Sequence, residues 1–569
     1  MRTDGGTPAT PGEAAAQGMT VLTTLAAGQF LMTLDSSVMN VSIATVAHDV
    51  GTDVTGVQTA ITLYTLVMAV LMITGGKIGQ IIGRKRAFAI GCVIYGSGSL
   101  TTALAPSLPV LILGWSLLEG IGAALIMPAI VGLVAANFAR SDRPRAYGLV
   151  ASAGAIAVAA GPLIGGLFTT YASWRWVFAG EVVVVVGILA MTRRMADEPA
   201  EAGGRLDLVG TALSALGLGL IVYGILRSGS WGLVLPKADG PEWLRLSPVI
   251  WMIMAGGAVM NVFVRWEGRV VARGGTPLVD VSQIANPTLR AGLTSFFFQY
   301  LTQAGLFFAV PLFLSVALGL SAIATGVRLL PLSITLLIAA VGVPRLFPRA
   351  SPRRVAQLGF SALFAGIVVL IIGLDVGAGP EIVTWPMLLA GLGIGALASQ
   401  LGAVTVSSVP DERSGEVGGL QNTLTNLGAS IGTALGGAVL ISALTSSFLT
   451  GLAGNPDVPE SVTAAADVDL ASGAPFISDK ELETALAATD LPPETSDAII
   501  DENADARLDA LRASLAILAV ITTFAIYAAR RLPERPAAEP DVTSSPDAAA
   551  PVAAPRHDPG TRVGSEPGP

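Results

Sequence analysis

The chain has 569 residues, of which 52% are apolar and only 13% are charged, and its formal net charge is −8. Soluble domains carry about 25% charged residues, so this composition excludes an ordinary soluble protein and indicates a membrane protein. A single cysteine, Cys92, excludes a disulfide framework. Two histidines, His48 and His557, are too few for a histidine-based metal site, and we expect neither a metal nor a cofactor.

Fourteen runs of mainly apolar residues are each long enough to cross a bilayer, which takes about 20 residues in a helix. The fold class that we predict is therefore an all-α polytopic membrane protein with fourteen spans. The runs lie near residues 19–46, 56–77, 87–105, 108–136, 146–171, 174–193, 207–226, 247–266, 289–318, 322–344, 355–374, 383–409, 417–449 and 508–530.

Basic residues gather in alternate short loops between these runs. They are Arg84, Lys85 and Arg86; Arg140, Arg143 and Arg145; Arg193 and Arg194; Arg265, Arg269 and Arg273; Arg345, Arg349, Arg353 and Arg354; and Arg530 and Arg531. With fourteen spans all these loops fall on one side, which the positive-inside rule assigns to the cytoplasm. An even number of spans places both termini on that side.

Basic turns at 75–86 and 343–354 follow the second and the tenth run, which indicates a six-helix repeat, although positive-inside charge alone explains the second turn equally well. We predict a cytoplasmic tail at 1–18, a six-helix bundle at 19–195, two inserted helices at 196–285, a second six-helix bundle at 286–530 and a disordered cytoplasmic tail at 531–569. Within the second bundle, an acidic extracytoplasmic loop at 450–507 is expected to hold a short helix near 479–489. The substrate path is predicted between the bundles.

Asp35 is a lone carboxylate in the first apolar run. An ionised Asp at the centre of a spanning helix costs roughly 2.5–3.5 kcal/mol, so the group must be protonated, face water or meet a cation. Its helical face carries small or polarisable residues, namely Gly28, Met32, Met39 and Ser42. We interpret Asp35 as a proton-binding site; the alternative is a permanently neutral Asp that hydrogen-bonds a neighbouring helix.

Glu119 is a second intramembrane acid, roughly 16 Å below the outer end of its helix. It is predicted to be a second protonation site, or else a neutral packing partner in a glycine-rich helix. Arg328 lies roughly 9 Å into its own helix, where it either extends to the outer interface or forms a buried ion pair. Glu181 is one candidate partner for it, and Asp35 and Glu119 are others.

Uncharged polar residues recur at helical spacing in two later runs. Gln299, Tyr300 and Gln303 lie in one of them, beside several phenylalanines, and Asn422 and Asn426 share a face of the other. Amides beside aromatic rings suit an amphiphilic or apolar cargo, so these residues are candidates for a substrate cavity. Hydrogen bonding between helices is the alternative for each of them.

Four motifs together resemble the signatures of the fourteen-span drug:proton antiporters of the major facilitator superfamily. They are LDSSVMNV at 34–41, GKIGQIIGRKR at 76–86, GPLIGG at 161–166 and SWRWVF at 173–178. The resemblance implies two six-helix bundles with two additional transmembrane helices between them. It also implies a protein of the bacterial plasma membrane that binds no nucleic acid and acts as a monomer among membrane lipids.

The resemblance assigns roles to particular residues. It implies a cytoplasmic latch made by Gly76, Gln80, Gly83, Arg84 and Arg86, an antiporter motif made by Gly161, Pro162, Gly165 and Gly166, and cavity positions at Asn40 and Tyr64. The chain departs from the family pattern at Gln80, where an acid is usual, and at Ser116 and Glu119, where the family has an arginine and a glutamine. We therefore expect an altered latch and an additional protonation site.

The leading hypothesis is a proton-coupled secondary exporter that moves a hydrophobic, amphiphilic or cationic small molecule outward by alternating access. An exporter of lipid or of an endogenous secondary metabolite is an alternative, and a non-transporting membrane sensor or scaffold is a second one. An enzyme is not expected. The glycines at 391–396 lie in an apolar helix with no preceding strand, and no phosphate-cradling GxxxxGK[ST] loop is present.

Overall fold

The computed structural model describes residues 11–52, 54–195, 204–237, 240–375, 377–410, 413–470, 476–487, 489 and 491–534. Contacts divide the chain into one unit at Met1–Ala537 and another at Ala538–Pro569. The second unit and most of the two predicted tails lie outside the described residues. In the described part of the first unit, the regular secondary structure is helical, apart from one isolated bridge between Trp243 and Leu246.

The helices follow the apolar runs of the sequence closely. The first half comprises α1 (Pro11–Asp49), α2 (Val54–Ile82), α3 (Arg84–Ala103), α4 (Leu108–Leu111), η1 (Ile112–Glu119), α5 (Gly120–Asn137), α6 (Arg143–Tyr171) and α7 (Arg175–Thr192). The inserted pair comprises α8 (Leu208–Trp231) and α9 (Pro248–Ala272). The second half comprises η2 (Val281–Ala285), α10 (Pro287–Leu312), η3 (Phe313–Ala317), α11 (Ala322–Leu346), α12 (Pro352–Gly373), η4 (Pro380–Val383), α13 (Thr384–Ser407), α14 (Ser414–Gly454), α15 (Glu460–Asp469), α16 (Asp479–Leu486), α17 (Pro493–Ala528) and η6 (Ala529–Arg531).

Twelve helices in the described residues are long and apolar enough to cross a membrane. The helices α1 and α3, which coincide with the predicted spans 19–46 and 87–105, are not among them. Helix α3 begins with three basic residues and is rich in glycine, serine and threonine in its second half, so its apolar character is weak. The polytopic helical fold class is confirmed, whereas the count of fourteen spans stays a prediction.

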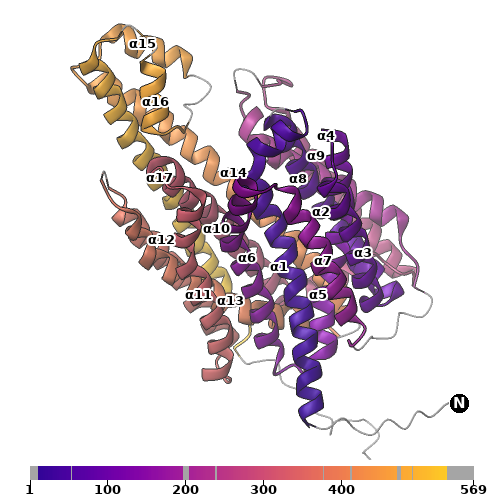
Figure 1. Cartoon of the computed structure of the whole chain (residues 1–569). Coiled ribbons are helices and arrows are strands. Elements are labelled where there is room, and N and C mark those ends of the chain that lie inside the picture. The colour runs from indigo at the N-terminus through magenta and orange to yellow at the C-terminus, as the bar shows by residue number, and fades with distance from the viewer. Residues whose placement is uncertain are drawn as a thin grey trace, which may run out of the picture. The chain divides into compact units, whose positions relative to one another are not determined.

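The helices pack as two groups that meet along a shared seam (Figure 1). In the first half, α1 lies against α6 and α7, and α5 lies against α2 and α3. In the second half, α10 lies against α14, α13 lies against α11 and α12, and α17 lies against α12 and α14. The halves meet where α6 contacts α11 and α13 and where α2 and α5 contact α14, while α8 and α9 pack on each other beside α2 and α14. This arrangement agrees with two bundles and an inserted pair, and the exact domain boundaries stay predictions.

The acidic segment is more helical than we predicted from the sequence. Helix α14 continues to Gly454 and α17 begins at Pro493, so both extend beyond the predicted spans 417–449 and 508–530, and α15 and α16 lie at this end (Figure 1). The prediction of a short helix near 479–489 is confirmed by α16, which begins with a capping box between Ser478 and Glu481. The buried Arg507 of α17 donates to the Ile477 carbonyl over 2.9 Å and pairs with Asp479, which fixes α16 to α17.

Candidate functional site

Asp35 lies in α1 beneath the indole of Trp115. The Trp115 Nε1 donates to both carboxylate oxygens of Asp35, at 2.8 and 2.9 Å, and both side chains are almost completely buried. The Trp115 ring stacks on Tyr64 of α2, with ring centres 5.1 Å apart and planes 5° from parallel. Asp35 is therefore enclosed in the first half, and its carboxylate is not exposed. The resemblance implies a cavity position for Tyr64, but the structure places Tyr64 in this enclosure beside Trp115.

Trp115 and Glu119 both lie on η1, a π-helical turn that joins α4 to α5. Residues four apart share a helical face, so the indole and the carboxylate point toward the same neighbours. Ser116, on the same segment, donates to the Ala60 carbonyl of α2 over 2.8 Å, which fixes η1 against α2. π-helical turns inside α-helices occur often at functional sites, and this one carries two residues of the candidate site.

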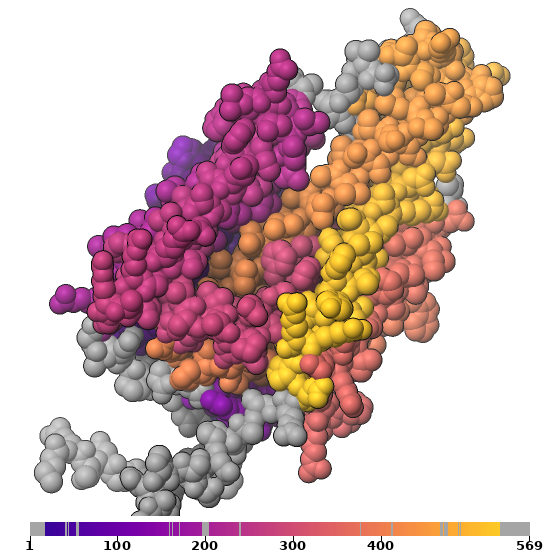
Figure 2. Space-filling view, turned by 180° about the vertical axis from the view of Figure 1, so that it is seen from behind, coloured from indigo at the N-terminus to yellow at the C-terminus, as the bar shows by residue number. Residues whose placement is uncertain are grey.

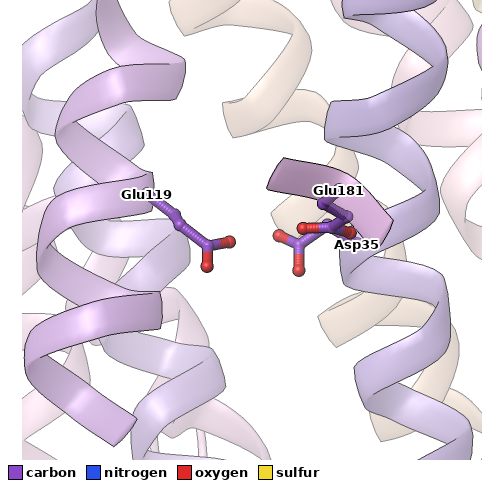
Figure 3. Close-up of side chains that lie close together, drawn as sticks. All are labelled: Asp35, Glu119 and Glu181. Atoms are coloured by element: carbon purple, nitrogen blue, oxygen red, sulfur yellow. The ribbon is translucent and has the colours of Figure 1, made fainter. Parts of the chain in front are cut away.

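Glu119 and Glu181 complete a cluster of three carboxylates with Asp35, and we call these three residues the acid cluster (Figure 3). One oxygen of each residue lies within 4.8 Å of the others, and all three side chains are buried. Thr102 of α3 donates to Glu119 over 3.1 Å, and Ser99 of α3 donates to Glu181 over 3.1 Å. The second oxygen of each glutamate has no hydrogen-bond partner in the described part of the chain.

Close approach of α3 to η1 depends on Gly98. A Cβ atom on this residue would lie 2.6 Å from the Glu119 Cγ and 2.7 Å from the Gly114 carbonyl oxygen, and real Cβ atoms essentially never approach so closely. Any other residue at this position would therefore push the two helices apart. Gly98 thus lets the backbone of α3 lie directly against the Glu119 side chain.

Three carboxylates this close together cannot all carry a charge in a protein interior. Like charges repel strongly where water is absent, and a buried anion without a partner is costly. Among the described residues, no lysine, arginine or histidine forms an ion pair with any of the three. The acid cluster must therefore hold protons or a hard cation, for which carboxylate oxygens are the usual ligands.

Glu181 does not pair with Arg328, for which it was one of three candidate partners. We considered it as a partner for Arg328, but it belongs to the acid cluster and accepts from Ser99. Arg328 is half-buried in α11, and within the described ranges no carboxylate forms an ion pair with it. The structure does not bring the two residues together.

A cavity of about 400 Å³ lies where the halves meet, and we call it the central cavity. Its wall includes five of the seven predicted substrate residues, namely Gln299, Tyr300, Gln303, Asn422 and Asn426. The side chain of a sixth, Asn40, lies outside the described residues. A larger space of about 1140 Å³ between α2, α8 and α14, which we call the vestibule, shares Ser36, Met68, Asn426 and Ala429 with the wall of the central cavity. Figure 2 shows it as the hollow between the inserted pair and α14.

The predicted latch turn lies where the halves are in close contact. A Cβ on Gly76 would be 2.6 Å from the Gly415 carbonyl oxygen of α14, so the backbones of α2 and α14 touch there. Lys77 forms an ion pair with Glu416 of α14 over 3.6 Å, with both side chains buried, and donates to Gln80 over 3.2 Å. Neither Lys77 nor Glu416 was among the latch residues predicted from the sequence.

Two other latch residues also lie against α14, since a Cβ on Gly415 would be 3.3 Å from the Gln80 Cγ and 3.8 Å from the Arg84 Nε. Gly83 has a φ of 94° and precedes α3, a conformation that favours glycine. Arg84 is buried and donates to the Gly132 carbonyl of α5 over 3.4 Å, whereas Arg86 is exposed. Gln80 accepts from Lys77, so the amide that replaces the usual acid still takes part in the turn.

In the antiporter motif of α6, Gly161 and Gly165 pack against α1. A Cβ on Gly161 would lie 2.0 Å from the Ser37 hydroxyl, and one on Gly165 would lie 3.3 Å from the Val38 Cα. Gly166 is half-buried, and the side chain of Pro162 lies outside the described residues. Gly161 and Gly165 therefore hold α6 against α1, which carries Asp35.

Two helical halves around a central cavity, with carboxylates buried inside one half, are the features of a secondary transporter. Residues 25–433 match the Major Facilitator Superfamily, and the chain belongs to this superfamily. It is a multi-pass membrane protein, in agreement with the resemblance found in its motifs.

Curated relatives are named as transporters and resistance proteins, in line with our expectation that the chain is not an enzyme. The "Probable actinorhodin transporter" of Streptomyces coelicolor is 27% identical over 72% of this chain and 70% of its own length. The puromycin resistance protein of Streptomyces alboniger is 30% identical over 73% of this chain and 80% of its own length. A solved structure of a bacterial homologue of the human lysosomal transporter Spinster, in an inward-facing and unoccupied conformation, covers 92% of this chain and 98% of its own with a TM-score of 0.51, and at 15% identity it shows the fold alone.

Proposed function

We propose that the chain is a proton-coupled exporter that moves a hydrophobic or amphiphilic small molecule out of the cell in exchange for protons. The acid cluster carries this proposal. Asp35, Glu119 and Glu181 are buried, lie within 4.8 Å of one another and have no cationic partner among the described residues, so protons are the simplest way to neutralise them. The names of the relatives support antibiotics or related secondary metabolites as the compound class.

Alternating access gives the two ends of the seam different roles. The Gly76 and Lys77 contacts to α14 close the end that carries the basic turns, which we assign to the cytoplasm together with both termini. The vestibule between α8 and α14 opens toward the other end. This closure at one end and opening at the other corresponds to an outward-facing state, from which the cargo leaves and to which protons gain access.

The test is transport by purified protein in proteoliposomes with imposed gradients of pH and voltage, using radiolabelled puromycin and chloramphenicol as probes. Asp35→Asn should fold and insert normally but lose pH-driven transport. Asp49→Asn makes the same change at the end of the same helix, outside the acid cluster, and should keep it. Equal transport rates with and without the pH and voltage gradients would refute the proposal. A Na⁺ gradient that drives transport at equal pH would assign the cluster to a cation instead.

A further inference from the structure

Among the described residues, the wall of the central cavity contains no carboxylate and no lysine, arginine or histidine side chain. It is formed by α1, α2, α5, α6, α10, α11, α13 and α14, and its polar members are hydroxyl groups and amides. A permanent cation inside it would lose its hydration and find no countercharge, which is costly in a low-dielectric space. Aromatic ring faces would offset only part of that cost.

The acid cluster does not provide the missing countercharge. Asp35 is fully buried under Trp115, on the side of α1 that faces η1, whereas the next residue, Ser36, lies in the wall of the central cavity. Glu119 and Glu181 are also absent from that wall. The proton site and the cargo site are therefore separate, with α1 between them.

Three glutamine side chains give the central cavity free hydrogen-bonding capacity. The side-chain oxygens of Gln299, Gln303 and Gln421 are buried and have no partner in the described residues. By contrast, Asn422 and Asn426 donate to carbonyls of their own helix, α14. Buried amide oxygens without partners are costly, and hydroxyl or N–H groups on a bound molecule would satisfy them.

The apolar part of the wall suits flat or irregular ring systems. Four methionines from three helices, Met32, Met68, Met72 and Met127, line the central cavity together with aromatic residues of α6 and α10. Methionine side chains are flexible and polarizable, so they adapt to ligands of different outline and pack well against aromatic rings. The shape of the cargo is therefore loosely specified, and its polarity is specified by the glutamines.

We infer that the cargo is an uncharged amphiphilic compound that carries hydrogen-bond donors, and that lipophilic cations are excluded. This inference rests on the proposed export function and narrows its substrate class. It also makes transport electrogenic, because exchange of protons for a neutral molecule moves net charge across the membrane.

Equilibrium binding to the purified full-length protein in detergent tests the inference. The probes are radiolabelled chloramphenicol, which is neutral, aromatic and carries hydroxyl and amide donors, and radiolabelled tetraphenylphosphonium, which is a permanent aromatic cation. Chloramphenicol should bind at least about tenfold more tightly, because only it satisfies the buried amides without bringing in an unpaired charge. Binding of neither probe, or equal or tighter binding of tetraphenylphosphonium, would overturn the inference.

Variants of α10 distinguish the effect of residues that line the central cavity from the effect of other residues in the same helix. Gln299→Leu and Gln303→Leu should each weaken chloramphenicol binding about three- to tenfold, because each leaves one donor unsatisfied. Gln303→Glu should reverse the preference toward the cation. Thr302→Val changes a neighbouring buried residue, which accepts from Thr522 and does not line the central cavity, and should bind like wild type.

Binding is measured without a gradient, so this test and the transport test can fail independently. Export of tetraphenylphosphonium driven by pH would overturn the exclusion of cations and leave proton-coupled export intact. Selective binding of chloramphenicol by a protein whose transport does not depend on pH or voltage would overturn proton-coupled export and leave the exclusion of cations intact. Binding of chloramphenicol that none of the glutamine variants changes would show that the inferred site is wrong.

Discussion

The indole nitrogen of Trp115 donates to both carboxylate oxygens of Asp35, at 2.8 and 2.9 Å, and this contact joins η1 to α1. A hydrogen bond to a charged acceptor is stronger than one between neutral groups, so the contact favours the ionised carboxylate and weakens when the group is protonated. Proton binding at Asp35 therefore changes how firmly α1 is held against η1. Because α1 also contributes to the wall of the central cavity, it connects the proton site to the cargo site.

Trp115→Phe should keep the ring that stacks on Tyr64 but remove the N–H donor. Loss of a hydrogen bond to a charged group costs about 1.5–3 kcal/mol, so the ionised state of Asp35 becomes harder to reach and pH-driven export should fall by about tenfold or more. Exchange of labelled cargo without a gradient should change much less. Trp251→Phe removes an indole donor in α9, far along the chain from the acid cluster, and serves as the control. Unchanged pH-driven export in Trp115→Phe would contradict this role.

Glu181→Gln removes one carboxylate from the acid cluster but keeps an acceptor for Ser99. Since three carboxylates within 4.8 Å share the bound protons, the number of protons exchanged per cargo molecule should fall, and Glu119→Gln should have a similar effect. The ratio follows from the voltage at which net transport reverses under a fixed pH gradient. Glu267→Gln, which changes a buried carboxylate of α9 outside the cluster, is the control. If the number of protons per cargo molecule is unchanged in both cluster variants, the two glutamates do not carry protons and Asp35 is left as the proton carrier of the acid cluster.

The acid cluster illustrates how far the sequence could predict the site. Asp35 and Glu119 were identifiable because each is an acid within an apolar run, and the cavity residues Gln299 and Gln303 because they share a helical face. Glu181 was one candidate partner for Arg328 because depth in the membrane can be counted along a helix, whereas the rotation of one helix against another cannot. Trp115 gave no signal, since a tryptophan in an apolar run is ordinary.

Other differences have equally physical causes. The π-helical turn η1 has no composition that distinguishes it from an α-helix, so its effect on the direction of Trp115 and Glu119 was not predictable. The extensions of α14 and α17 beyond the apolar runs were missed because hydropathy marks where lipid begins and not where a helix ends. The pairing of Lys77 with Glu416 was not predictable either, because the two residues lie far apart along the chain, in α2 and α14.

The buried ion pair between Lys77 and Glu416 should hold the latch end of the seam closed. Glu416→Gln removes the negative charge that faces the buried Lys77 ammonium, and breaking a buried ion pair typically costs about 3–5 kcal/mol. The closed arrangement of α2 and α14 should therefore be less populated, and the latch end should open more often. Slower pH-driven export is expected as well, because both closed states are needed for each transport cycle.

Cysteine labelling measures this opening directly, since Cys92 is the sole cysteine and Cys92→Ala gives a clean background. Ser414, which is fully buried near the pair, is changed to cysteine and exposed to a membrane-impermeant maleimide from the latch side. Labelling should be several-fold faster with Glu416→Gln than without it. The double exchange Lys77→Glu with Glu416→Lys should restore slow labelling, and fast labelling in that variant would argue against the pair as the latch.

Close packing of α14 on α10 predicts a large stability effect at Gly432. A Cβ there would lie 2.0 Å from the Leu301 carbonyl oxygen, which is backbone and cannot rotate away. Gly432→Ala should therefore lower the free energy of unfolding by about 1–3 kcal/mol or more. Gly257→Ala in α9 meets nothing within 4 Å and should be neutral or slightly stabilising. Thermal unfolding of both variants in detergent makes the comparison. Equal midpoints would show that α10 and α14 move apart at this contact without loss of stability.

We predict that the protein loses stability in acid because of Asp49, which lies at the end of α1 and outside the predicted span 19–46. It accepts from Trp174 over 3.0 Å and pairs with Arg175 over 2.9 Å. Burial alone would raise the pKa of Asp49, but hydrogen bonds from Trp174 and His48 and the charge of Arg175 outweigh it, so its pKa lies below the ordinary value. A lowered pKa means that the contribution to stability is complete above about pH 4, the ordinary value for Asp, and disappears as the pH falls through the pKa of the folded state.

Asp49→Asn should consequently lower the unfolding temperature at pH 7 and lose its difference from wild type at low pH. The side chains of Asp49 and Arg175 are about one-third exposed, so water weakens the pair and the expected loss at pH 7 is at most about 1 kcal/mol. Thermal unfolding in detergent between pH 3 and pH 7 gives the measurement, with Asp142→Asn, which changes an exposed carboxylate in the turn before α6, as the control. A difference from wild type that persists unchanged down to pH 3 would mean that Asp49 acts through packing and not through its charge.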